Sequence, residues 1–236
     1  MGLKALVIGY GSIGQIHAAI LNNMKIFSSI TVLTQQKNIL FPSISDLKHI
    51  TTLDPDYIVI ASSTNTHFKY FKYIEEVFKN KLLLIEKPLF SEKLEISSLK
   101  NKIFVGYNLR FHPVLKTIKS LIEGRHIYSF HVYCGSFLPN WRPGRDYRKT
   151  SSANSIMGGG VLLDLSHELD YTQWLLGELC LKNVINKKIS NLEIDTDDVL
   201  SLSAKSDKVE NIQIDLNYFS RLPTRQMLIS GEGICV

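Results

Sequence analysis

Several features that mark other classes of protein are scarce in this sequence. Its 236 residues include only 3 cysteines, too few and too widely spaced for a disulfide framework or a zinc site. No apolar run approaches the roughly 20 residues of a membrane-spanning helix, and the short N-terminal run is not followed by a signal-peptide cleavage site. No stretch has the dense Lys and Arg block of a nucleic-acid-binding tail, although the net charge is +5. We therefore expect a cytoplasmic protein with reduced thiols that binds neither membrane nor nucleic acid.

The first seventeen residues carry the most informative motif. Gly9-Tyr10-Gly11-Ser12-Ile13-Gly14 follows an apolar strand-like run at 4–8, and residues 13, 16, 20 and 21 then repeat an apolar side chain at helical spacing. In this strand–turn–helix context Gly9 allows a tight turn, Gly11 lets a pyrophosphate approach, and Gly14 lets helix and strand pack closely. The phosphates would lie at the helix N-terminus, beside Ser12 and Ile13. The alternative is a glycine turn without a ligand, which the flanking elements disfavour.

The end of the second predicted strand, residues 29–34, bears on the choice of cofactor. NAD sites usually have an acidic residue there that binds the ribose 2′-hydroxyl. This chain has Thr34-Gln35-Gln36-Lys37 instead, and Thr34, Gln35 and Lys37 can accept a 2′-phosphate. The sequence therefore favours NADP slightly over NAD, although Lys37 alone is more simply a solvated loop charge.

Strands and helices alternate along the first half of the chain. Strands are expected at 56–61, 82–85 and 102–105, a helix at 66–79, and a further helix capped by Ser91. This alternation predicts an α/β fold with a doubly wound parallel sheet over residues 1–124. From about Ile127 the expected strands are 127–136, 199–203, 211–218 and 226–229, interrupted by one helix at 160–176. They predict a second, α+β domain over residues 125–236, with a mostly antiparallel sheet.

Ligands of doubly wound sheets bind beyond the carboxyl ends of the strands. The polar residues that follow the predicted strands are therefore candidates for the cofactor and substrate site: Ser62, Ser63, Thr64, Asn65, His67, Glu86, Lys87 and Asn108. Lys87 can donate a proton or polarise a carbonyl oxygen if it is partly buried in a cleft. Read alone, it is more simply a surface lysine.

The predicted helix at 160–176 carries Asp164, His167 and Asp170 at intervals of three, which places them along one side of the helix. A histidine flanked by carboxylates is a candidate general base. The alternatives are a solvated polar stripe and a metal site, for which no further ligand is evident. Guanidinium groups suit a carboxylate or phosphate on a substrate, which makes candidates of Arg110, Arg142, Arg145 and Arg148; a solvated basic loop is the alternative.

Five of these segments, in this order, resemble the glucose-fructose oxidoreductase / inositol dehydrogenase (Gfo/Idh/MocA) family over nearly the whole chain. They are Gly9–Gly14 with His17, Ser63-Thr64-Asn65-Thr66-His67, Glu86-Lys87-Pro88, the segment from Gly106 to Pro113, and the segment from Gly158 to Asp170. The resemblance implies an N-terminal Rossmann domain and an NAD(P)-dependent oxidoreductase of a sugar or polyol. It also implies a homo-oligomer formed through the open face of the second sheet.

The same resemblance implies roles for three side chains. Lys87 would lie by the nicotinamide and substrate, and Asp164 and His167 would bind substrate and transfer a proton. The segments 139–148 and 158–171 are similar to family members associated with surface-polysaccharide sugars, so Asn108, Arg110, Arg142 and Arg148 are expected to bind an acidic or nucleotide-linked sugar.

Two departures from the family pattern are visible. Asp164 and His167 are separated by three residues, whereas many relatives have four. Relatives also continue with more strands and a closing helix after the segment that ends here at Val236, so we expect an incomplete second sheet. The sequence leaves open a non-catalytic dinucleotide-binding protein and an enzyme for a non-sugar substrate such as a linear tetrapyrrole or a dihydrodiol.

Overall fold

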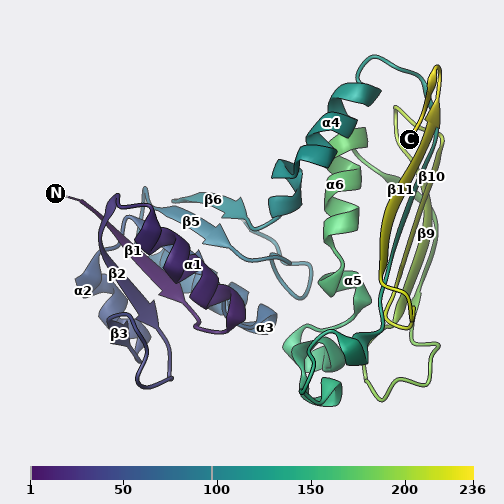
Figure 1. Cartoon of the computed structure of the whole chain (residues 1–236). Helices are drawn as coiled ribbons and strands as arrows, with labels where there is room; N and C mark the ends of the chain where they lie inside the picture. The colour runs from purple at the N-terminus through teal and green to yellow at the C-terminus, as the bar shows by residue number, and fades with distance from the viewer. Residues whose placement is uncertain (1, 97) are drawn as a thin grey trace. The chain divides into compact units, whose positions relative to one another are not determined.

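The computed structural model describes residues 2–96 and 98–236. They form two compact units, one ending at Gly106 and the other running from Tyr107 to Val236 (Figure 1). The division falls before the boundary expected near Gly124. The reason is helix α4 (Pro113–Ile122), because its Leu115 and Ile122 are buried in the core of the second unit.

The first unit is built on a six-stranded sheet in which every neighbouring pair is parallel, in the order β3-β2-β1-β4-β5-β6. Its strands are β1 (Leu3–Ile8), β2 (Phe27–Leu33), β3 (Ser43–Ile44), β4 (Tyr57–Ile60), β5 (Leu82–Ile85) and β6 (Lys102–Val105). Its helices are α1 (Ser12–Asn23), α2 (Ile50–Leu53), α3 (Thr64–Val77) and the 3₁₀ helix η1 (Leu47–His49). The central strands are apolar at consecutive positions because both faces of the sheet are covered. The predicted doubly wound parallel sheet is confirmed.

Helix α1 buries small residues rather than its isoleucines. Its buried residues are the small Gly14 and Ala18 and the larger Leu21. Ile16 and Ile20 each remain 52% exposed, and Ile13 remains 41% exposed. Of the four apolar residues that recur at helical spacing, only Leu21 is buried. Small residues face the sheet because the helix lies close to the glycine turn, and the isoleucines form an exposed apolar stripe.

The connection between β5 and β6 lacks the expected helix. None of its described residues is helical, so the prediction that Ser91 caps a helix is wrong. Phe90 instead packs against two rings of α3, with centroid distances of 5.2 Å to Phe68 and 5.5 Å to Phe71. An aromatic side chain thereby covers part of the sheet face that a crossover helix would cover.

The second unit is built on another six-stranded sheet, in the order β12-β11-β7-β10-β9-β8. Only β7 and β10 pair in parallel, so the sheet is mostly antiparallel as expected. Its strands are β7 (Ile127–Gly135), β8 (Cys180–Lys187), β9 (Val199–Lys205), β10 (Asn211–Asn217), β11 (Thr224–Gly231) and β12 (Ile234–Cys235). The sequence missed β8, because this edge strand is exposed along its whole length and shows no alternation of buried residues.

The helices of the second unit lie on one face of this sheet (Figure 1). They are α4, α5 (Val161–Asp164), α6 (His167–Leu176) and the 3₁₀ helices η2 (Asn108–Phe111), η3 (Leu138–Asn140), η4 (Tyr147–Lys149), η5 (Ser151–Ala153) and η6 (Ser155–Met157). The core between helices and sheet includes Phe130, Leu176 and Tyr218. Among residues 2–96 and 98–236, no helix combines the length and the hydropathy needed to cross a membrane.

The predicted continuous helix at 160–176 is broken into two. At Leu165 the backbone leaves helical values, with φ −99° and ψ 25°, and the leucine side chain enters the core. Asp164 therefore ends α5, whereas His167 and Asp170 belong to α6. The expectation that all three lie along one side of a single helix is wrong.

Candidate functional site

The glycine turn after β1 has the geometry that a bound dinucleotide requires. Gly9 has φ +96°, and a Cβ there would lie 2.7 Å from the Ala61 carbonyl oxygen. A Cβ on Gly14 would lie 2.2 Å from the Gly9 carbonyl oxygen, so helix and turn are in direct contact. A Cβ on Gly11, in contrast, would meet no atom within 4 Å. The turn thus excludes side chains at two positions for packing and leaves open space at the third.

The N-terminus of α1 fits an anionic ligand as well. Gly11 occupies the N-cap position and has no side chain to accept a hydrogen bond, and the first turn contains no acidic residue. The first backbone N–H groups of a helix, here at Ser12 and Ile13, then favour a phosphate through their direction and the helix dipole. The residues present therefore fit the pyrophosphate of a dinucleotide.

The end of β2 contributes amides rather than an acid. The Thr34 hydroxyl accepts a hydrogen bond from the Gln36 backbone (3.1 Å), and Gln35 Nε2 donates to the Ser45 carbonyl oxygen (2.8 Å). Gln36, which was not a candidate, donates from Nε2 to the Tyr10 carbonyl oxygen (3.1 Å) and so ties this loop to the glycine turn. No local pattern marks this bond, because the two residues are 26 positions apart. Lys37 is exposed.

The segment after β4 is partly a structural tie. Thr66 Oγ1 donates to the Ser62 hydroxyl (2.8 Å), Ser63 and Asn65 are exposed, and Thr64 is half-buried. His67, a candidate cofactor ligand, is only 1% exposed. Its ring nitrogens face backbone carbonyl oxygens, Nδ1 that of Pro88 (3.1 Å) and Nε2 that of Ser62 (3.1 Å). The structure therefore uses His67 to join the ends of β4 and β5.

Glu86 and Lys87 follow β5, as expected. Glu86 Oε1 lies 2.7 Å from His17 Nε2, and the half-buried pair links the end of β5 to α1. Glu86 Oε2 accepts a hydrogen bond from the Lys87 backbone (3.3 Å). Lys87 is half-buried and is joined to Pro88 by a cis peptide bond. The His17–Glu86 contact connects two of the five motifs on which the resemblance rests.

In the second unit, His167 begins α6 in a polar cluster. The Tyr107 ring meets the His167 ring edge to face, with centroids 5.6 Å apart. Arg110 forms a two-pronged ion pair with Asp170, in which Nε lies 2.8 Å from Oδ2 and Nη2 contacts Oδ1. Burial raises the pKa of Tyr107, which keeps its hydroxyl protonated. Arg110, a candidate for substrate, is thus held by Asp170, while Asn108 is exposed at the start of η2.

Asp164 is bound from a distant strand end. The Tyr218 hydroxyl donates to Asp164 Oδ2 at 2.6 Å, from immediately after β10. The sequence missed Tyr218 because it lies 54 positions away and belongs to none of the recognised motifs. The histidine and the acid that precedes it are therefore held by different elements.

Glu168, next to His167, is another residue that the sequence missed. It is 0% exposed, and its Oε1 accepts a hydrogen bond from Arg225 Nε of β11 (2.6 Å). Burial raises the pKa of Glu168, and Arg225 opposes that effect in smaller part. Burial likewise raises the pKa of the neighbouring Cys134 thiol to about 11, so it stays protonated and unreactive.

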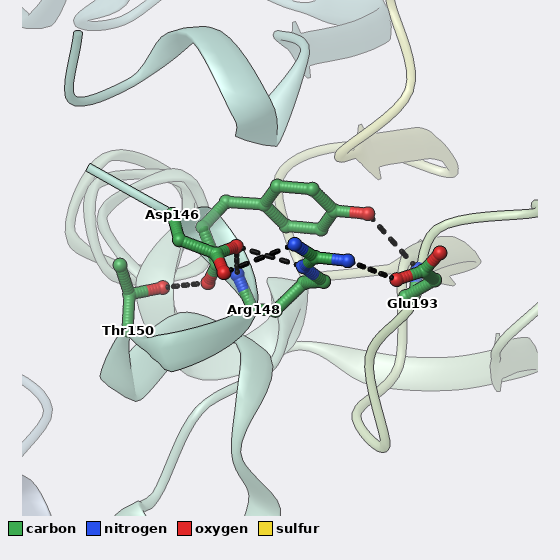
Figure 2. Close-up of polar contacts among 5 residues, drawn as sticks. Asp146, Arg148, Thr150 and Glu193 are labelled. Carbon is green, nitrogen blue, oxygen red and sulfur yellow. Dashed lines mark hydrogen bonds and ion pairs between the residues drawn. The ribbon is translucent and has the colours of Figure 1, made fainter. Parts of the chain in front are cut away.

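The arginines between β7 and α5 fall into two groups. Figure 2 shows Arg148 between two acids, with Nε 2.8 Å from Asp146 Oδ1 and Nη1 2.8 Å from Glu193 Oε2. Arg142 and Arg145 are exposed and line a small hollow together with Trp141. The structure therefore keeps Arg148 in local ion pairs and leaves the other two at the hollow.

Comparison with known proteins agrees with the glycine-turn geometry. The family model described as the oxidoreductase family with an NAD-binding Rossmann fold matches residues 3–103. This match over the first unit agrees with the resemblance to the Gfo/Idh/MocA family. The matched region contains the glycine turn, the segment after β4, and Glu86-Lys87-Pro88.

Two curated relatives agree with this match. An uncharacterized oxidoreductase of Bacillus subtilis, YrbE, is 28% identical over 190 residues, which is 72% of this chain and 53% of that protein. Inositol 2-dehydrogenase of Rhizobium meliloti is 29% identical over 133 residues, which is 53% of this chain and 38% of that protein. The chain thus spans about half the length, or less, of the curated relatives it matches.

Solved structures share the fold over both units. The WlbA dehydrogenase of Bordetella pertussis, solved in complex with NADH and UDP-GlcNAcA, superposes with a TM-score of 0.79 and 17% identity. The similarity covers 98% of this chain and 76% of that one. At this identity the comparison establishes the fold of the second unit and not its ligand.

Proposed function

We propose that this chain provides the machinery of an NAD(P)-dependent oxidoreductase that transfers hydride between a nicotinamide and a hydroxyl or carbonyl group of a sugar or sugar derivative. The observation that carries the proposal is the glycine turn. Gly9 and Gly14 leave no room for a side chain while Gly11 opens onto free space beneath an uncapped helix N-terminus. A turn selected only to connect strand and helix has no need of the third glycine.

In this proposal the bound nicotinamide supplies hydride transfer, and residues of this chain handle the proton. Oxidation of an alcohol needs a base for the hydroxyl proton, and His167 is the candidate, with Asp164 binding the substrate. Lys87 polarises or protonates the oxygen of the reacting group. The family resemblance supports these three assignments, and the half-buried setting of all three side chains is compatible with them.

We further propose a slight preference for NADP. The absence of an acid in residues 34–37 supports it, since the first acidic residue after β2 is Asp46. Asp46 caps η1 by accepting a hydrogen bond from the Lys48 backbone (2.9 Å). Thr34, Gln35 and Lys37 are then the side chains nearest in sequence to receive a 2′-phosphate. A carboxylate in their place would repel that group.

The proposed substrate carries an acidic group or a nucleotide. The hollow beside Trp141, with Arg142 and Arg145 exposed at it, supports this choice because guanidinium groups bind carboxylate and phosphate in two-pronged pairs. The UDP-GlcNAcA bound to the Bordetella WlbA dehydrogenase offers a relevant probe. A link to surface polysaccharides is part of the same proposal.

The proposed assembly is a homo-oligomer formed through the face of the second sheet opposite its helices. Leu228 of β11, 52% exposed beside the wholly buried Ile229, supports an interface there. The proposed location is the cytoplasm, which the free thiols of Cys180 and Cys235 support.

Fluorescence titration of the purified chain with NADPH and NADH tests the proposal first, followed by turnover of a panel that includes myo-inositol and UDP-GlcNAcA. We expect micromolar binding of at least one cofactor, tighter for NADPH, and reduction of the nicotinamide with a member of the panel. Tighter binding of NADH would contradict the NADP preference alone. Binding without turnover would favour a non-catalytic dinucleotide-binding protein. If neither NADPH nor NADH binds, the proposal is overturned.

A further inference from the structure

Tyr218 is an unusually well-fixed residue. It is 0% exposed and follows β10 directly. Its backbone N–H donates to the Asp198 carbonyl oxygen (3.0 Å), and its own carbonyl oxygen accepts from the Leu138 backbone (2.9 Å). The ring packs edge to face on Trp141, with centroids 5.2 Å apart. Both the backbone and the ring of Tyr218 are therefore held in one position.

The hydroxyl of this fixed ring is directed at Asp164. It donates to Oδ2 at 2.6 Å, a short bond of the kind made to a charged acceptor. Burial strongly raises the pKa of Tyr218, and the negative charge of Asp164 adds to the effect, so the phenol keeps its proton and remains a donor.

A second carboxylate, that of Asp197, lies near Asp164. Asp197 caps the N-terminus of α5, where its Oδ2 accepts from the Leu162 backbone (2.9 Å). Burial, and in smaller part the charge of nearby Asp164, raises the pKa of Asp197. Repulsion between the two like charges alone would favour orientations in which the two carboxylates point away from each other. The phenol offers Asp164 a fixed partner that opposes this repulsion.

We propose that Tyr218 is a positioning residue that fixes the orientation of the Asp164 carboxylate for substrate. The inference rests on the proposed function, in which Asp164 binds the substrate. Tyr218 itself is wholly buried and does not reach the substrate. A tyrosine that served packing alone would be replaceable by phenylalanine without effect on turnover.

The test compares Y218F with Y133F in the full chain. Tyr133 is a matched control, because its hydroxyl also makes hydrogen bonds in the same sheet, at 2.5 Å to Ser220 Oγ and 3.0 Å from Asn217 Nδ2, on side chains that the proposed reaction does not use. We expect Y218F to lower kcat on the active member of the myo-inositol and UDP-GlcNAcA panel by roughly ten- to a hundredfold, the factor for losing a hydrogen bond to a charged group. The dissociation constant for NADH should change less than about twofold, because its binding residues lie in the first unit, and Y133F should leave kcat unchanged.

A double-mutant cycle with D164A, measured by urea unfolding, tests the contact without any substrate. We expect the effects of Y218F and D164A on the free energy of unfolding to be non-additive, as for residues in direct contact. Additive effects, or a Y218F enzyme with the kcat of wild type, would overturn the role of Tyr218 alone. If wild type turns over no member of the panel, the proposed function fails, and the role of Tyr218 fails with it.

Discussion

The two units build their candidate site residues in different ways. In the first unit the backbone determines the geometry, since the main chain packs so closely around Gly9 and Gly14 that no side chain fits there. In the second unit side chains hold one another across elements. Tyr218 binds Asp164, Arg110 binds Asp170, and Arg225 binds Glu168, over sequence distances of 54, 60 and 57 residues.

This difference has a physical consequence for how each half responds to change. A substitution in a backbone turn either clashes with neighbouring atoms or does not, so its effect depends on the space at that one position. Pairs in which a buried acid is held by one partner are more sensitive, because removal of that partner weakens the compensation of a charge in a medium of low dielectric constant. We therefore expect the largest effects of single substitutions on stability in the second unit.

The largest effect should follow Arg225→Ala. This change leaves the wholly buried Glu168 without its partner, and we expect the free energy of unfolding to fall by about 3 kcal/mol, the low end for broken buried pairs, because the Arg225 side chain is itself 49% exposed. Urea unfolding measures it. Glu168→Gln is the matched control, because it retains an oxygen for Arg225 Nε while removing the charge, and it should cost clearly less. Equal losses of unfolding free energy in the two variants would show that Arg225 does not act by compensating the buried charge of Glu168.

The same pair predicts a dependence of stability on pH. Because the pKa of Glu168 is raised in the folded state, the folded protein keeps a proton that the unfolded chain loses near its ordinary value of 4.5. The contribution of Glu168 to the free energy of unfolding therefore declines as the pH rises above about 4.5, until the pH passes the folded pKa. In Glu168→Gln this decline should be absent, and a profile with the wild-type slope would contradict the assignment.

An intermediate effect should separate two glycines of the same turn. Gly14→Ala places a methyl carbon against the Gly9 carbonyl, and we expect a loss of about 1–3 kcal/mol in the free energy of unfolding, together with weaker cofactor binding. Gly11→Ala meets no protein atom and has φ −70°, so the free energy of unfolding should stay within about 0.5 kcal/mol. Its dissociation constant for NADH should nevertheless rise roughly tenfold or more, since the methyl group occupies the space of the pyrophosphate. Unchanged binding in Gly11→Ala would contradict the site.

The ability of the sequence to predict these residues follows the same division. The glycine turn, the strand ends and Lys87 are marked by neighbours in sequence, so local patterns identified them. His67 was identified as a polar residue at a strand end, but its burial between carbonyl groups depends on the path of the chain after Lys87. The spacing of the α1 isoleucines predicted the helix but not their exposure, because this helix lies close to the sheet and buries the small residues Gly14 and Ala18.

In the second unit, local patterns identified the acids and the histidine but not what holds them. The break at Leu165 could not be predicted, since Val161 to Leu176 has the residues of a continuous helix. Tyr218 meets Asp164 only when the end of β10 reaches α5, and Arg225 meets Glu168 only when β11 reaches α6. Edge strand β8 was missed for the opposite reason, because it buries too little to leave a pattern.

The smallest effect should come from Arg148→Ala. Both ion pairs of Arg148 lie in solvent, so we expect no measurable change in the urea midpoint and a change of less than about twofold in KM for UDP-GlcNAcA. Arg142→Ala should raise that KM roughly tenfold, because Arg142 lines the hollow and makes none of these ion pairs. A larger effect of Arg148→Ala on KM would indicate that the acidic group of the substrate binds at η4 and not at the hollow.

The position of Arg148 also makes one part of the molecule responsive to ionic strength. Its pair with Glu193 joins η4 to the loop before β9, and exposed charges of this kind are screened over about 8 Å at physiological salt. Added salt therefore weakens this pair, and it also competes with an acidic substrate for the exposed guanidinium groups of Arg142 and Arg145. The glycine turn of the first unit is set by steric contact and does not respond to salt. Affinity for an acidic sugar should accordingly fall as salt is added, whereas the shape of the glycine turn should stay the same.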